Sequence, residues 1–155
     1  MTIFKSLFRK KKLECPRCLG KKFVDWEDIR RLNNLLKWTP GPCAYCNASG
    51  KVDQEMLEKV AVNHVYLTAD LPESEMEKIK NGDVDTLEKA KQHEIFVDNL
   101  IKFAEHYYVT QNMNAENIAN LYLNTEDEMA LFSVERKNLI EYIEKIIELK
   151  SADFN

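Results

Sequence analysis

The chain has few of the residues that break helices. It contains four glycines and four prolines in 155 residues, and beyond residue 51 only Pro72 and Gly82 remain. A sheet with many tight turns needs such residues repeatedly. Their scarcity disfavours a turn-rich β fold and predicts long helices after residue 51. We therefore expect a mainly α protein, with a helical bundle of about five helices over residues 53–155.

The sequence also lacks a long apolar run. No stretch approaches the roughly 20 apolar residues that a membrane-spanning helix needs. At the N-terminus the apolar residues precede the basic run Arg9–Lys12, the reverse of the order in a secretory signal. We therefore expect a cytoplasmic protein. In that reducing compartment, paired cysteines are more often metal ligands than disulfides.

Residues 1–12 form a separate N-terminal arm in this interpretation. Ile3, Phe4, Leu7 and Phe8 fall on one stripe of a helix, followed by the basic cluster. Such an arm is typical either of weak contact with a membrane surface or of a short helix that packs on its own protein. Both interpretations stay open.

Signatures of catalysis are missing. There is no glycine-rich loop of the kind that cradles phosphate, and the three histidines are scattered along the chain. One of them, His64, falls on the apolar face of an expected helix over about 54–68, where a packed histidine is the simpler interpretation than a metal ligand. The carboxylates lie on expected helix surfaces and caps. We therefore do not expect an enzyme.

Against these absences stand four cysteines in two close pairs. They read Cys15-Pro-Arg-Cys18 and Cys43-Ala-Tyr-Cys46, with 24 residues between the pairs. Two Cys-x-x-Cys pairs at this separation are typical of a zinc site, to which each pair contributes a tight turn with two sulfurs. The four cysteines fill a tetrahedral site and leave no position for a reactive water. The sequence thus predicts one structural zinc ion.

Charge is unevenly distributed around this site. Residues 1–51 hold 12 Lys/Arg and 4 Asp/Glu, whereas residues 52–155 hold 10 and 22. The asymmetry indicates an anionic partner for the first half, contact between the halves, or simply two solvated surfaces of opposite sign. Four thiolates also leave a zinc site negatively charged, so nearby cations are expected to offset it. The candidates are Arg17, Lys21, Lys22 and Lys51.

The rest of the expected organisation follows from caps and periodicity. Residues 13–52 form a zinc module, in which a short strand at 21–24 pairs with a return strand at 47–52. Asp25 caps a helix that continues through Leu36 until Pro40-Gly41-Pro42 ends it. In the acidic helical domain, residues 53–155, further helices follow the one at 54–68. The next helix begins at Asp70–Glu73 and ends at Gly82, and another begins at Asp85. Two more helices are expected, one over 115–123 and one that begins with a cap at Thr125.

The residues around the cysteines resemble the cysteine-rich zinc domain of DnaJ-type co-chaperones. That family repeats Cys-x-x-Cys-x-Gly-x-Gly, and each copy here keeps one of the two glycines, Gly20 in the first and Gly50 in the second. The resemblance covers residues 14–52, with two of the family's four repeats. No His-Pro-Asp sequence of a J-domain is present. What carries over is the metal site, with Cys15, Cys18, Cys43 and Cys46 as ligands.

Three functions remain in competition. The first is a non-catalytic protein-interaction module, an accessory or chaperone-like factor with an unidentified protein partner. The second is binding of single-stranded nucleic acid or RNA through the basic residues 1–51 and the aromatic residues among them. The third is a thiol–disulfide oxidoreductase at Cys15–Cys18. Besides the cysteines, the candidate binding residues are Arg17, Lys21, Lys22, Phe23, Trp26, Trp38 and Tyr45. The oligomeric state is left open.

Overall fold

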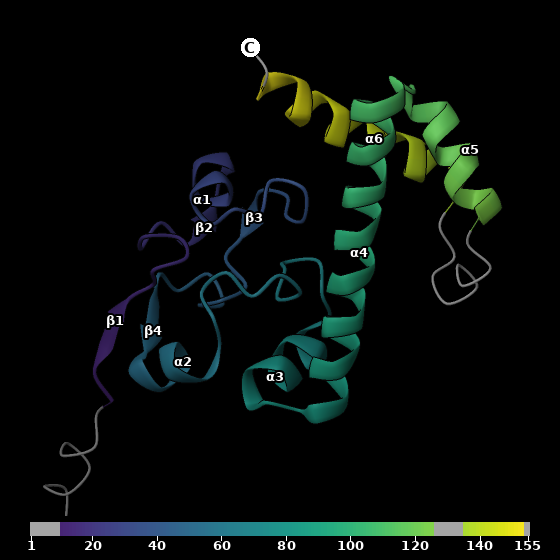
Figure 1. The fold of residues 1–155 in the computed structure, drawn as a ribbon. Helices are drawn as coiled ribbons and strands as arrows, with labels where there is room; N and C mark the ends of the chain where they lie inside the picture. Colours follow the sequence, from purple (N-terminus) through teal and green to yellow (C-terminus); the bar gives the residue numbers. More distant parts are fainter. Residues whose placement is uncertain (1–9, 126–134, 154–155) are drawn as a thin grey trace, which may run out of the picture. The chain divides into compact units, whose positions relative to one another are not determined.

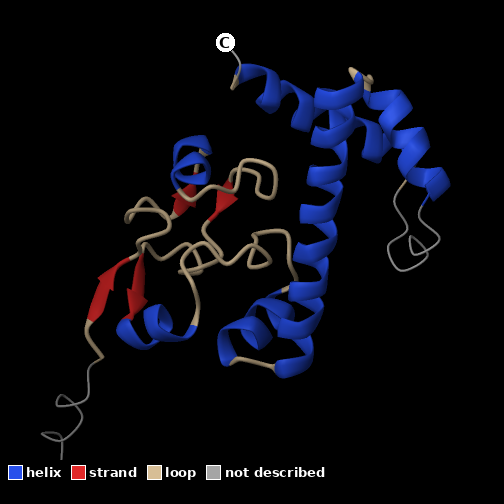
Figure 2. Ribbon diagram, in the orientation of Figure 1, coloured by secondary structure: helices blue, strands red, loops and turns tan. Residues whose placement is uncertain are grey.

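The computed structural model describes residues 10–125 and 135–153. The chain divides into two compact units, Met1–Gln92 and His93–Asn155. Figures 1 and 2 show a first unit rich in loops with short strands and helices, and a second unit made of helices. The expected fold class, a small cysteine module with helices after it, is confirmed.

The first unit contains four short strands and the helices that follow them. The strands are β1 (Lys12–Glu14), β2 (Phe23–Val24), β3 (Gly41–Pro42) and β4 (Lys51–Asp53). The helices are α1 (Trp26–Arg31), α2 (Gln54–Lys59) and α3 (Glu73–Asn81), followed by the start of α4 (Val84–Gln111).

The strands pair in a way that the sequence did not reveal. β1 pairs with β4 and β2 pairs with β3, each antiparallel. The expected pairing between residues 21–24 and 47–52 is therefore wrong. Each cysteine pair has one strand before it and one after it, and the strand before one pair binds the strand after the other. This pairing pattern stays the same when the two cysteine turns, each with its flanking strands, are exchanged.

Helix α1 begins as predicted and ends early. Asp25 accepts from the backbone N–H of Asp28, and the Asp28 side chain accepts from Asp25, which completes a capping box. The helix ends at Arg31 instead of continuing through Leu36, because Asn33 adopts a left-handed conformation with φ 58°. Asparagine tolerates this conformation better than most residues.

Helix α2 also ends early, at Lys59, so the expected helix over 54–68 is wrong beyond that residue. We call residues 60–68 the 60–68 loop. Several of its backbone carbonyls accept hydrogen bonds from side chains of the cysteine module. Tyr45 Oη donates to Val60 and Trp38 Nε1 donates to Val65. Arg17 donates to Val62, His64 and Leu67. His64 therefore lies in a loop and not on a helix face.

One hydrophobic core joins the cysteine module to residues beyond 53. It contains all four cysteines together with Val60, Leu67 and Ile79, and Met56, Met76 and Leu87 pack against it. The compact division between Gln92 and His93 therefore differs from the boundary expected at residue 53. A small metal module has little apolar surface of its own, so it gains stability by burying that of its neighbours.

The end of α3 agrees with the predicted break at Gly82, but the expected cap at Asp70 is wrong, because the N-cap of α3 is Pro72 and makes no side-chain hydrogen bond. Gly82 follows α3 in the left-handed conformation, with φ 75°. Asp83, rather than the expected Asp85, accepts from the backbone N–H and the hydroxyl of Thr86 at the start of α4.

The second unit contains the rest of α4 with α5 (Ala115–Thr125) and α6 (Arg136–Ala152). The predicted turn near 111–114 and the helix after it are confirmed, and Leu139, Ile143 and Ile146 of α6 are buried. Thr125, the expected cap of the last helix, is the final residue of α5, and the residues expected to follow it, 126–134, lie outside the described part. Of the expected arm over residues 1–12, the structure describes only residues 10–12, and Lys12 belongs to β1. Among the described helices, none combines the length and the apolar character of a membrane span.

Candidate metal centre

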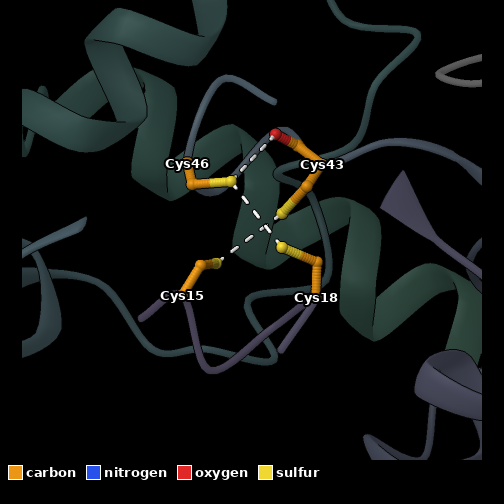
Figure 3. Close-up of side chains that lie close together, drawn as sticks. All are labelled: Cys15, Cys18, Cys43 and Cys46. Carbon is orange, nitrogen blue, oxygen red and sulfur yellow. Dashed lines mark hydrogen bonds between the residues drawn. The ribbon is translucent and has the colours of Figure 1, made fainter. Parts of the chain in front are cut away.

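The four cysteines come together in one buried cluster. Their Sγ atoms all lie within 4.8 Å of one another, and the residues are between 0 and 6% exposed. Figure 3 shows the four side chains pointing toward a common centre, with Cys15 facing Cys43 and Cys18 facing Cys46. The structure therefore confirms that the two pairs, 28 residues apart, form a single site.

The distances fit a tetrahedral metal. The Sγ atoms of Cys15 and Cys43 are 3.8 Å apart, as are those of Cys18 and Cys46. A regular tetrahedron of sulfurs about 2.3 Å from a central zinc has edges of about 3.8 Å. A disulfide would bring the sulfurs to about 2.05 Å, and all four cysteines are free.

Both cysteine turns adopt the same backbone conformation. The first, second and fourth residues after each pair have positive φ: Leu19, Gly20 and Lys22 in the first turn, and Asn47, Ala48 and Gly50 in the second. The second and fourth positions are those at which the DnaJ-type repeat has glycine. Here Ala48 and Lys22 occupy two of them, and each residue accepts a strained conformation that glycine would adopt freely.

Gly50 is required for a second reason. A Cβ atom at this position would lie 2.7 Å from the backbone oxygen of Gly20. At Gly20 itself, a Cβ would meet only the flexible Glu14 side chain, at 3.3 Å. The close approach at Gly50 also supports the site, because Gly50 accepts from the Cys15 backbone N–H and donates its own N–H to Cys46 Sγ.

Backbone N–H groups favour the thiolate form, although burial of Cys18 outweighs them and raises the pKa of its thiol. Cys15 Sγ accepts from the N–H groups of Arg17 and Cys18, and Cys18 Sγ accepts from that of Lys22. Such N–H donors favour the ionised sulfur that a metal requires.

Packing the sulfurs together opposes their joint ionisation. The hydrogen bond with Cys43 lowers the pKa of the Cys15 thiol to about 5. The same hydrogen bond, together with burial, raises the pKa of Cys43. Four thiolates at this spacing therefore need a cation among them, as expected for a site that binds metal and releases protons.

Two positive side chains lie in the electrostatic field of the cluster. Burial lowers the pKa of Arg17 to about 10, and the charges of Cys43 and Cys15 oppose this shift. Burial also lowers the pKa of Lys80, against the influence of Cys43 and Cys46. A zinc ion with four thiolates carries a formal charge of about −2, which one arginine and one lysine balance.

The structure separates the predicted binding residues into two groups. Arg17, Trp38 and Tyr45 are buried, at 2, 6 and 1% exposure. They bind the chain's own 60–68 loop, and the Arg17 guanidinium lies 4.3 Å from the centroid of the Trp38 ring and 5.1 Å from that of Tyr45. Trp38 and Tyr45, two of the candidate binding residues, are therefore internal, and their polar atoms donate to loop carbonyls inside the unit.

The other group lies at the surface. Phe23 and Trp26 are 48 and 54% exposed, and Lys22 is exposed beside them. Lys21 forms ion pairs with Asp25 and Asp28, so its charge is used within the module. Lys51 is exposed on β4, where it lies opposite Glu14.

Sequence reasoning missed Lys80 and the 60–68 loop. Lys80 lies 34 residues beyond the last cysteine and donates to Asn47 Oδ1 at 2.6 Å, so spacing alone gave no reason to place it beside the sulfurs. The loop carried the apolar pattern of a helix.

Comparison with known proteins adds no further assignment. No protein-family model matches the chain, and neither a curated protein nor a solved structure shows detectable similarity to it.

Proposed function

We propose that this chain is a zinc-stabilised protein-interaction module, a non-catalytic accessory factor of chaperone-like type. The observation that carries the zinc assignment is the cluster of four buried sulfurs, in which two Sγ–Sγ distances are 3.8 Å and all lie within 4.8 Å. Four protein ligands complete a tetrahedral coordination, so the ion holds the fold and leaves no open position for water. The repeated positive-φ pattern at the glycine positions of both turns supports the resemblance to the DnaJ-type zinc domain.

The exposed aromatic residues support a protein partner. Six large hydrophobic residues are exposed in the described part of the chain. Three of them are close in sequence: Leu19 in the first cysteine turn, Phe23 in β2 and Trp26 in α1. Aromatic residues that stay exposed near a rigid metal site are typical anchors for a partner protein. We call these three residues the aromatic surface.

The charges disfavour nucleic acid as that partner. Lys10, Lys12, Lys21 and Arg31 all form ion pairs with acidic residues of the first unit, and Arg17 is buried. Two of these pairs, Lys10–Glu55 and Lys12–Asp53, join basic residues of 1–51 to acidic residues beyond 51, so the basic excess is partly neutralised within the molecule. Binding of a nucleic acid depends on cations that remain available for phosphates.

The burial of the sulfurs also disfavours redox chemistry. A reactive Cys-x-x-Cys pair lies at a helix N-terminus with an accessible sulfur. Cys15 and Cys18 are both fully buried and lead into a turn. We therefore retain the interaction module over the oxidoreductase.

Metal analysis of the purified chain tests the zinc assignment. We expect one zinc ion per chain, and removal by a chelator should abolish the amide dispersion of residues 12–92, because metal binding and folding are coupled in such modules. Added zinc should restore it. A metal-free chain in which these residues keep their native amide spectrum would refute the assignment.

A capture experiment from native extract tests the interaction. The Phe23→Ser/Trp26→Ser variant should lose the captured proteins that wild type retains, and chelator should have the same effect. Val84→Ser is the matched control, because Val84 is 77% exposed and lies outside the aromatic surface. Equal capture by all three forms would contradict the assignment of this surface.

A further inference from the structure

The first unit contains a pocket beside the metal centre. Its volume is about 260 Å³, and its lining consists of residues 38–42 and 67–70 together with Arg17, Val24 and Ala44. Gly41 and Ala69, both in its lining, lie close together, since a Cβ at Gly41 would lie 3.5 Å from that of Ala69. The pocket is separate from the four sulfurs and is not explained by the zinc site.

One end of the pocket offers hydrogen-bond donors in an apolar setting. Arg17 is 2% exposed and its guanidinium stacks on the Trp38 ring. Carbonyls of the 60–68 loop accept from three positions of this group. A guanidinium has five N–H donors, so the bonds made by the described residues leave donors for an incoming oxygen.

The size of the pocket selects the kind of occupant. Sites for cofactors and drug-sized ligands usually exceed about 300 Å³. An apolar cavity of about 150 Å³ accommodates benzene. A volume between these values suits one large amino-acid side chain rather than a free cofactor.

The position of the pocket connects it to the aromatic surface. Pro42 lines the pocket and lies opposite Phe23 in the pairing of β2 with β3. Asp70, which also lines the pocket, is exposed, and the ion pairs found among the described residues do not include it. An occupant beside Phe23 therefore meets apolar walls, internal N–H donors and one carboxylate.

We propose that this pocket receives one large apolar side chain, such as phenylalanine, from an extended segment of the partner protein. A backbone carbonyl of that segment accepts from Arg17, and a lysine or arginine next to the apolar residue faces Asp70. This inference rests on the proposed interaction function and names the type of segment that the module binds. Because Arg17 lies between Cys15 and Cys18, zinc also holds one end of the pocket in place.

A titration of the zinc-loaded, ¹⁵N-labelled chain tests the proposal. The probe is the capped dipeptide N-acetyl-Phe-Lys-amide. We expect saturable shifts at millimolar probe, the range usual for so small a ligand, at the Trp38 indole and at the amides of residues 39–44 and 67–70. N-acetyl-Phe-Glu-amide should bind about threefold more weakly, because it places like charge at Asp70. N-acetyl-Gly-Lys-amide should give no such shifts.

A blocking variant supplies the decisive comparison. Ala69→Leu places a larger side chain at an exposed residue of the pocket lining and should weaken binding of the probe at least about tenfold. Ala61→Leu makes the same change at another exposed alanine of the first unit and should bind as wild type. Both variants should retain one zinc and a native spectrum, so lost binding reports on the pocket alone.

Three results would overturn the proposal. They are the absence of saturable shifts with the phenylalanine probe, equal binding by Ala69→Leu and wild type, and shifts of the same amides with oligothymidylate in place of peptide. If any of these occurs while Phe23→Ser/Trp26→Ser still abolishes partner capture, the pocket assignment fails and the proposed function stands. Loss of the native spectrum without zinc is scored separately and concerns only the metal.

Discussion

Replacing Arg17 with methionine should be among the most destabilising single changes in the first unit. The guanidinium donates to the carbonyls of Val62, His64 and Leu67, at 2.7 Å for Val62, and these groups lie 45 to 50 positions away in the sequence. Methionine keeps an apolar stem of similar length but leaves those carbonyls without their donor. Each unsatisfied buried group costs about 1–3 kcal/mol, and loss of the stacking on Trp38 adds about 1 kcal/mol.

Part of this cost is offset, because the methionine variant no longer buries a charged group and so avoids its desolvation penalty. We therefore expect Arg17→Met to lower the free energy of unfolding by about 3–5 kcal/mol. That is a large share of the 5–15 kcal/mol typical of a domain. Arg17→Lys should lie between, because a single ammonium cannot donate along the three directions of the guanidinium fork.

The assay is urea unfolding of the zinc-loaded chain in a Trp26→Phe background, in which Trp38 is the remaining tryptophan and reports directly on the site. Arg30→Met is the matched control, since Arg30 is exposed in the same unit, and it should change stability by no more than about 0.5 kcal/mol. If Arg17→Met unfolds within about 1 kcal/mol of Arg30→Met, the loop does not depend on this arginine. Should the methionine variant fail to fold, Arg17→Lys supplies the same comparison.

Three further predictions concern the turns and the second unit. Gly50→Ala should lower the free energy of unfolding by about 2 kcal/mol or more, because the new Cβ combines a positive φ with a close contact on backbone. Gly20→Ala should lower it by only about 1 kcal/mol. Equal losses in urea unfolding would contradict this. Ala48→Gly should raise stability by about 0.5 kcal/mol, the relief of a positive φ less the added freedom of the unfolded chain, and a lower unfolding midpoint would refute it. Burial, reinforced by Asp98, raises the pKa of Tyr142 to about 12. The folded chain therefore holds this proton more tightly than the unfolded chain does. The stability that this difference contributes is complete below pH 10 and is lost as pH rises toward 12. Circular dichroism of Tyr142→Phe should show a shallower loss over that interval, and an identical pH profile would count against burial as the cause.

The metal ligands were predictable because their signal is local. Two cysteines three positions apart can hold one ion between them only if the intervening chain turns tightly, and a second such pair completes the tetrahedron. The same locality explains the successful predictions of the Asp25 cap and of the break at Gly82. A cap or a left-handed glycine acts on residues within one turn of itself.

Predictions failed where distant segments compete for the same backbone groups. Residues 60–68 carry an apolar periodicity that favours a helix, yet their carbonyls bind Arg17, Trp38 and Tyr45. These hydrogen bonds replace those of a helix, so the helix ends at Lys59. The predicted strand pairing failed for a similar reason. Each cysteine pair has a possible strand on both sides, and the sequence does not show which strand pairs with which.

The sequence by itself thus determined a four-cysteine site followed by helices, because cysteine spacing, caps and scarce breakers act through near neighbours. Only the tertiary structure decided that the site continues into residues 53–92, that Lys80 and Arg17 lie in the field of the sulfurs, and that Trp38 and Tyr45 are internal while Phe23 and Trp26 are exposed. The physical reason is that burial and charge compensation depend on which surfaces meet. That choice is made when the separate segments pack around one core, and no single segment encodes it.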